Sequence, residues 1–187
     1  HDTAINNSVV YADSPFLYKV SSATVTTGLK RYFINCTSGG TGCTNDYNTS
    51  ALGRSLTGLD VNAQYCFTVK ASDAVDNNST ASSAACLFTL AKPPGALTVT
   101  GLSGSTATVK ISDVNGNPAA TQFAIYDDIK QKYVADDNSL SSATAIWKTK
   151  TSWGNTGGFI LSQMSTTYAL KVKARNGDLV ETVFSTD

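Results

Sequence analysis

The sequence has very little of the chemistry on which most active sites depend. Among its 187 residues there is one histidine, His1, one glutamate, Glu181, and one methionine. A Ser–His–Asp or Cys–His catalytic set needs an imidazole inside the fold, and the sole imidazole here stands at position 1. We therefore expect a protein that is not an enzyme and that has no catalytic residues.

The chain also lacks an excess of charge and long hydrophobic runs. Fourteen Lys and Arg balance fourteen Asp and Glu, and only 15% of residues are charged. A net charge of zero gives no electrostatic reason to expect nucleic acid or an acidic membrane as partner. No apolar run approaches the length that spans a bilayer, so we expect no membrane insertion. Ser and Thr make up about a quarter of the chain, which favours strands and turns.

The chain divides into two halves with the same plan. Consecutive prolines in residues 91–95 (Ala-Lys-Pro-Pro-Gly) cannot donate ladder hydrogen bonds, which suits a short, stiff linker. Residues 65–71 (Tyr-Cys-Phe-Thr-Val-Lys-Ala) alternate as a strand does, and residues 168–174 (Tyr-Ala-Leu-Lys-Val-Lys-Ala) repeat the pattern. No stretch has a sustained helical period. We therefore expect an all-β protein of two antiparallel β-sandwiches, over residues 1–91 and 92–187.

A further motif precedes the alternating strand of the first half. Residues 56–59 (Leu-Thr-Gly-Leu), followed by that strand, resemble the sixth-strand signature of fibronectin type III domains, and residues 168–177 are similar. Residues 125–154 resemble variants that are common in bacterial surface proteins. The resemblance implies two tandem immunoglobulin-like sandwiches. It also implies that Tyr65 and Tyr168 form tyrosine corners, in which each hydroxyl ties a crossover loop to the sheet.

All four cysteines, Cys36, Cys43, Cys66 and Cys86, lie in the first half. An even, clustered set in a Ser/Thr-rich chain indicates two disulfides and hence an oxidising, extracellular or cell-surface compartment. A zinc site is the main rival, but the spacings do not match a two-residue knuckle. We prefer the pairs Cys36–Cys43, across a Gly-rich loop, and Cys66–Cys86, across neighbouring strands. The other two connectivities stay open.

Five Asn-x-Ser/Thr sequons begin in the same half, at Asn6, Asn35, Asn48, Asn77 and Asn78. In a chain this rich in Asn, Ser and Thr, chance alone supplies several sequons. The sequence therefore leaves their glycosylation open.

Calcium is the most credible metal for this chain. Asp73 with Asp76, and Asp113 with Asn115, offer clustered oxygen ligands of the hard type that calcium takes. Neither cluster has ligands at every second position with a closing acid, and Asx turns explain both clusters as well. We expect no cofactor, and calcium at these residues is the alternative.

Two tryptophans and two pairs of adjacent acids complete the candidate residues. Trp147 and Trp153 are possible ligand-binding residues, because indole faces stack on sugar rings, although large aromatic side chains are mostly buried. The acid pairs 127–128 and 136–137 present at most one carboxylate to each face of a strand, which favours solvated turns over a glycosidase site.

These features favour a non-catalytic extracellular structural or adhesive protein, such as the repeating subunit of a surface layer or filament. Its partners would be copies of itself, or other surface proteins and glycans, reached through exposed β-edges. The N-terminal segment 5–11 can pack on its own domain or add to a neighbouring subunit, and we favour the first. The alternative is a carbohydrate-binding accessory module of a secreted enzyme.

Overall fold

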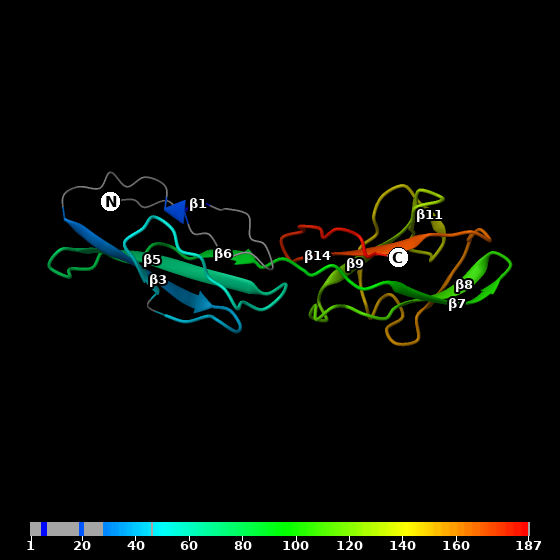
Figure 1. Ribbon diagram of the computed structural model, residues 1–187, viewed down its shortest axis with the longest axis horizontal. Helices are drawn as coiled ribbons and strands as arrows, with labels where there is room; N and C mark the ends of the chain where they lie inside the picture. Colours follow the sequence, from blue (N-terminus) through cyan, green and yellow to red (C-terminus); the bar gives the residue numbers. More distant parts are fainter. Residues whose placement is uncertain (1–4, 7–18, 21–27, 46, 187) are drawn as a thin grey trace. The chain divides into compact units, whose positions relative to one another are not determined.

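The computed structural model describes residues 5–6, 19–20, 28–45 and 47–186 (Figure 1). The chain divides into two compact units, His1–Leu90 and Ala91–Asp187. This boundary lies one residue earlier than the sequence suggested, because the side chain of Ala91 is buried in the core of the second unit. None of the described residues is helical, and they contain no helix that could cross a membrane.

The first domain contains a four-stranded antiparallel sheet and a separate two-stranded pair. In sheet order the four strands are β4 (Tyr47–Thr49), β3 (Leu29–Ser38), β5 (Gln64–Asp73) and β6 (Ala85–Phe88). The two-stranded pair joins β1 (Ile5–Asn6) to β2 (Lys19–Val20). Of the N-terminal segment, β1 therefore pairs within its own chain, and residues 7–11 lie outside the described residues.

The core of the first domain follows from the period-two alternation of its two long strands. Strands β3 and β5 run side by side (Figure 1), and each turns every second side chain to the same face. The buried side chains on that face include Tyr32, Ile34, Tyr65, Phe67 and Val69. The strand predicted at residues 65–71 is thus β5, with its apolar members facing inward.

The second domain is built from two antiparallel sheets. One sheet consists of β13 (Phe159–Leu161), β8 (Thr106–Ile111) and β7 (Leu97–Ser103), in that order. The other consists of β11 (Leu140–Ser142), β10 (Lys132–Val134), β9 (Gln122–Asp127) and β12 (Lys148–Thr149), with β14 (Leu170–Arg175) paired to β9. Inward side chains of both sheets form a single core, which includes Val109, Ile111, Phe123, Ile125 and Val172.

Both disulfides lie in the first domain. Cys36 and Cys43 are joined with an S–S distance of 2.03 Å, and Cys66 and Cys86 with 2.04 Å. The second bond links residues that face each other directly across β5 and β6. This is the pairing that the sequence favoured, and no cysteine is left free for a metal.

In each domain the segment that follows β5 or β14 is hydrogen-bonded to that strand through side-chain hydroxyls. The hydroxyl-bearing residues are Ser79, Ser82, Thr182 and Ser185. In the first domain they accept hydrogen bonds of 2.9 and 3.0 Å from the backbone N–H groups of Ala71 and Val69. In the second, Ala174 and Val172 donate in the same way, at 3.0 and 3.1 Å. Hydroxyl oxygens therefore accept where a regular ladder would use carbonyl oxygens.

The turns that precede these segments share one backbone conformation. The fourth residue of each turn, Asp76 or Leu179, has a φ of 64°. Aspartate tolerates this left-handed region, because its short polar side chain bonds locally, whereas leucine places its Cβ close to a carbonyl oxygen. In the second turn, Asn176 and Val180 close the loop with a backbone hydrogen bond of 3.0 Å. The strain at Leu179 is therefore held by the surrounding hairpin.

We expect the substitution Leu179→Gly to raise the free energy of unfolding of the second domain by about 1 kcal/mol. The leucine side chain is 62% exposed, so little buried surface is lost when it is removed. Urea unfolding followed by tryptophan fluorescence measures the change, because both tryptophans lie in this domain. Val180→Gly, at a neighbouring position without positive φ, is the matched control and should destabilise the domain. Equal losses in the two variants would show that position 179 is unstrained.

Candidate functional site

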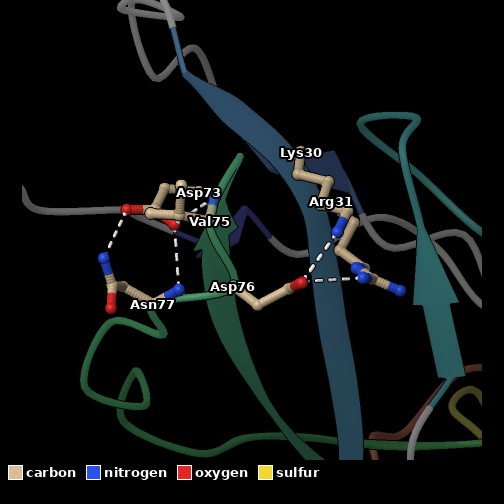
Figure 2. A network of polar contacts seen from close by, with 6 residues as sticks. All are labelled: Lys30, Arg31, Asp73, Val75, Asp76 and Asn77. Carbon is tan, nitrogen blue, oxygen red and sulfur yellow. Dashed lines mark hydrogen bonds and ion pairs between the residues drawn. The ribbon is translucent and has the colours of Figure 1, made fainter.

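Asp73 organises the hairpin turn that follows β5 (Figure 2). Its Oδ1 accepts hydrogen bonds from the backbone N–H groups of Val75, at 3.0 Å, and Asn77, at 2.8 Å. Its Oδ2 accepts a 2.9 Å bond from the Asn77 side-chain amide. These bonds, led by the one from the Asn77 side chain, hold the pKa of Asp73 below its usual value. The carboxylate thus builds the turn.

Asp76 points away from Asp73 and toward β3 (Figure 2). Its Oδ1 lies 2.9 Å from Lys30 Nζ and 2.8 Å from Arg31 Nη2. The hydrogen bonds from Lys30 and then Arg31 lower the pKa of the Asp76 carboxyl. The two acids that were candidates for one calcium ion therefore serve different partners. The described part of the chain has no group of three or more His, Cys, Asp or Glu side chains that could hold a metal.

The depressed pKa values of Asp73 and Asp76 predict a loss of stability in acid. A carboxyl whose pKa is lower in the folded state stabilises the fold above its unfolded pKa, near 3.8, and loses that contribution as the pH falls through its folded value. We expect Asp76→Asn to make the stability of the first domain less dependent on pH below about 4, because asparagine keeps the left-handed backbone and removes the titrating charge. Thermal unfolding from neutral pH to pH 2 measures this, and parallel curves for variant and wild type would contradict it.

The second pair of calcium candidates fastens the proline segment to its own domain. Asp113 Oδ1 accepts a 2.7 Å bond from the Asn115 backbone N–H, and Asn115 Nδ2 donates to Pro93 O at 3.0 Å. Buried Asn117 bonds both the N–H and the carbonyl of Lys92, at 2.9 and 2.7 Å. Of the two candidate calcium ligands, Asn115 thus anchors the proline segment, and Asp113 holds the turn that carries Asn115. The segment expected to be a linker is tied to the second domain from Ala91 onward, because these side chains replace missing ladder bonds.

Trp153 is a core residue, as is usual for a large aromatic side chain, and its burial rules out the possible role as a ligand platform. The side chain is 1% exposed, and its Nε1 donates a 2.9 Å hydrogen bond to Phe123 O. Its ring centroid lies 5.0 Å from that of Phe159. An indole enclosed in this way cannot stack on a sugar ring, so the carbohydrate-binding alternative loses the tryptophan on which it mainly depended.

Trp147 belongs to a cluster of rings and cations on the outward face of β14. The Arg175 guanidinium carbon lies 4.6 Å from the centroid of the Trp147 ring. Lys173 Nζ lies 5.4 Å from the Tyr133 ring centroid and 2.5 Å from Glu181 Oε2. Burial lowers the pKa of Lys173, but its bonds to Glu181 and Tyr133 outweigh this effect and raise it overall. Sequence reasoning missed this cluster, although the alternation of β14 places its cations on the outward face.

The four adjacent acids of the second domain also serve turns and ion pairs; they are Asp127, Asp128, Asp136 and Asp137. Asp127 is buried and accepts a 3.0 Å bond from Ala169 N, and Asp128 pairs with Lys171. Asp136 Oδ1 lies 3.3 Å from Lys148 Nζ, and Asp137 Oδ1 accepts a hydrogen bond of 2.9 Å from Ser139 N. These contacts agree with turn roles for Asp128, Asp136 and Asp137. The expectation of a solvated turn is wrong for Asp127, which is buried because the backbone N–H groups of Ile129 and Ala169 both bond its Oδ1.

A tyrosine corner is present in the first domain. The Tyr65 hydroxyl accepts a 2.9 Å bond from Asp60 N and donates a 2.6 Å bond to Thr41 O. Tyr168 is half-buried beside the second core, but among the described residues its hydroxyl has no hydrogen-bond partner. The residue five positions earlier, Gln163, has a φ of 59° and accepts from the Lys130 side chain instead. The loop from Met164 to Tyr168 is shorter than the matching loop from Leu59 to Tyr65, and the second corner is unformed.

Comparison with known proteins identifies the fold. No family model matches the chain, and no curated protein matches it in sequence. Among solved structures, the chain is similar to a two-domain fibronectin type III segment of chicken tenascin, at 10% sequence identity and a TM-score of 0.51. The match covers 98% of this chain and 94% of that segment. The fold is thus two tandem fibronectin type III-like sandwiches, as the motifs predicted; likeness at this identity carries no activity.

Proposed function

We propose that the chain is an extracellular structural or adhesive protein that acts by contact with further copies of itself. Two disulfides support an oxidising compartment. The candidate carboxylates support a role without catalysis, because each is engaged in a turn or an ion pair instead of converging on a shared cleft.

The observation that most directly supports self-association is the edge strand β7. It is the last strand of its sheet, and its sequence, Leu-Thr-Val-Thr-Gly-Leu-Ser, has no charged residue and no proline. Natural edge strands are usually protected by lysines, prolines, bulges or short length. The register irregularity of β7 lies between Thr100 and Ser103, so residues 97–100 keep a regular register without a bulge of their own. Their backbone groups on the open side can pair with β7 of a second copy around a two-fold axis.

A single β7–β7 contact closes a dimer. A surface layer or filament needs a second interface on each subunit, since one isologous contact uses the same patch on both copies. The outward ring-and-cation cluster around Trp147 supports such an interface, because aromatic and arginine side chains are enriched at protein contacts.

The proposal is tested by adding a charge to the β7 edge. We expect Thr100→Lys, at an exposed position, to weaken self-association at least about tenfold, because a lysine on an edge strand opposes pairing with another chain. Ile160→Lys is the matched control: it adds the same charge to β13, at the other end of the sheet, where the side chain is 60% exposed. Sedimentation velocity over a wide concentration range measures the affinities. A wild-type protein that stays monomeric throughout, or equal effects of the two variants, would overturn the proposal.

A further inference from the structure

The structure separates the sequons of the first domain into two kinds, beginning with Asn48. This residue is exposed on β4, the edge strand of the four-stranded sheet. Among the described residues, no hydrogen bond involves its side-chain amide, although its carbonyl accepts one from Arg54 at 2.9 Å. Ser50, which supplies the hydroxyl of the sequon, is exposed and likewise unbonded within the described chain. Amide and hydroxyl are both accessible.

Asn78 offers the same combination at the start of the segment that pairs with β5. The residue is exposed, and within the described ranges its side-chain amide has no hydrogen-bond partner. Its backbone is held in place by a bridge to Ser72. Thr80, the hydroxyl residue of this sequon, is also exposed, and only its carbonyl is engaged, by the Ser79 hydroxyl at 2.9 Å.

Asn77 belongs to the other kind, because the fold uses both of its recognition groups. Its side-chain Nδ2 donates to Asp73 Oδ2 at 2.9 Å (Figure 2). The hydroxyl of its sequon, on Ser79, accepts a 2.9 Å bond from Ala71 N and donates to Thr80 O. Both residues are exposed, so these hydrogen bonds, and not burial, hold the amide and the hydroxyl away from an enzyme.

Asn35 is restrained in a similar way. It is half-buried on β3, which lies between β4 and β5. The middle residue of its sequon, Cys36, is fixed by a disulfide, and the hydroxyl of Thr37 donates to Cys66 O at 3.2 Å. The side chain of Asn6 lies outside the described residues.

We propose that the folded chain is an N-glycan acceptor at Asn48 and Asn78 and not at Asn35 or Asn77. The co-reactant is an oligosaccharide linked to a polyprenyl diphosphate. The amide nitrogen of Asn48 or Asn78 bonds to the anomeric carbon as the bond from that carbon to the diphosphate oxygen breaks. The nitrogen loses one of its two protons to a base of the transferase, and the polyprenyl diphosphate leaves. Asn48 and Asn78 are proposed because the transferase recognises both the amide and the hydroxyl of a sequon, and both groups are accessible at these two sites.

A glycan at Asn48 would have a structural consequence for the first domain. Within the described residues, the outer edge of β4 has no partner strand, and another strand could extend the sheet there. A bulky, hydrated substituent on β4 blocks such pairing. The second domain has no sequon, so its β7 edge stays bare. Glycosylation would thus prevent strand pairing at the β4 edge and leave the β7 edge available for it. The selection of acceptor asparagines does not depend on the self-association proposed above.

The test uses the purified, folded, disulfide-bonded chain as the substrate of an oligosaccharyltransferase, with a polyprenyl-diphosphate oligosaccharide as donor. Peptide mapping by mass spectrometry, before and after enzymatic removal of glycans, locates each modified asparagine. We expect modification at Asn48 and Asn78 alone. The reduced, unfolded chain, treated in parallel, should also be modified at Asn35 or Asn77, which would show that the fold makes the selection.

Variants sharpen the test without removing buried groups. Ser50→Ala should abolish modification at Asn48, and Thr80→Ala should abolish it at Asn78 while leaving the sequon of Asn77 complete. Asn77→Gln is the control and should leave both glycans in place. The proposal would be overturned if Asn35 or Asn77 were modified in the folded chain. It would also be overturned if Asn48 and Asn78 stayed unmodified in the folded chain, whether or not the unfolded chain is modified.

Discussion

Replacing Trp153 with alanine is expected to lower the free energy of unfolding of the second domain by about 3 to 5 kcal/mol, the usual range for a large aromatic residue removed from a core. The indole is 1% exposed and packs against Phe159, so its loss opens a cavity that the surrounding strands cannot fill. It also deprives the buried carbonyl of Phe123 of its 2.9 Å hydrogen bond. Such a loss is a large part of the stability of a small domain.

The destabilisation by Trp153→Ala should be confined to the second domain, because each domain has a hydrophobic core of its own. Hydrogen exchange of peptides from both domains measures this, and Trp147 still supplies a fluorescence signal for urea unfolding. Trp147→Ala is the control and should cost about 1 kcal/mol, since its ring is half-buried and stacks on Arg175. Equal losses in the two variants would mean that position 153 is not the core anchor.

The parts of the fold that the sequence predicts well are those that depend on local periodicity. The alternation at residues 65–71 indicates which side chains face inward, and β5 buries Tyr65, Phe67 and Val69 on one face. The repeat at residues 168–174 does the same for β14, where Leu170 and Val172 are buried. Period-two burial is a property of the strand itself, so no knowledge of distant residues is needed.

The two tryptophans show why side-chain environments could not be predicted in the same way. Trp147 and Trp153 are six positions apart and identical in chemistry. One is buried because Phe123 and Phe159, from other parts of the chain, enclose it. The carboxylates of Asp73 and Asp76 likewise have different environments. Lys30, which is distant in sequence, forms an ion pair with Asp76 and holds it beside β3. Such differences depend on tertiary neighbours that spacing does not reveal.

The last segment of the second domain shows a different limit. Its apolar residues predict a strand over residues 179–184, yet only an isolated bridge at Glu181 forms there. The hydroxyls of Thr182 and Ser185 accept hydrogen bonds from the N–H groups of β14. The two acceptors are three positions apart in sequence, whereas the two donors on β14 are two positions apart. A hydroxyl that replaces a carbonyl in a ladder breaks the period on which the prediction depends.

Removing the Cys66–Cys86 bond, by changing both residues to alanine, is expected to cost the first domain about 3 kcal/mol, because the bond closes a loop of 20 residues in the unfolded chain. The Cys36–Cys43 bond spans only 7 residues, so chain entropy alone gives it about 2 kcal/mol. Urea unfolding of the two double variants, followed by tyrosine fluorescence and hydrogen exchange, measures both values.

The order in which the bonds are reduced provides an independent check on this comparison. Cys86 is exposed on the outward face of β6, whereas Cys36 is buried in the core, so a thiolate reaches the Cys66–Cys86 bond more easily. Mild reduction followed by alkylation should therefore label Cys66 and Cys86 first, and β6 should then lose protection from exchange. If the Cys36–Cys43 variant proves the less stable, the packing of Cys36 in the core outweighs chain entropy. Labelling would still begin at Cys86, because access and stability are set by different parts of the structure.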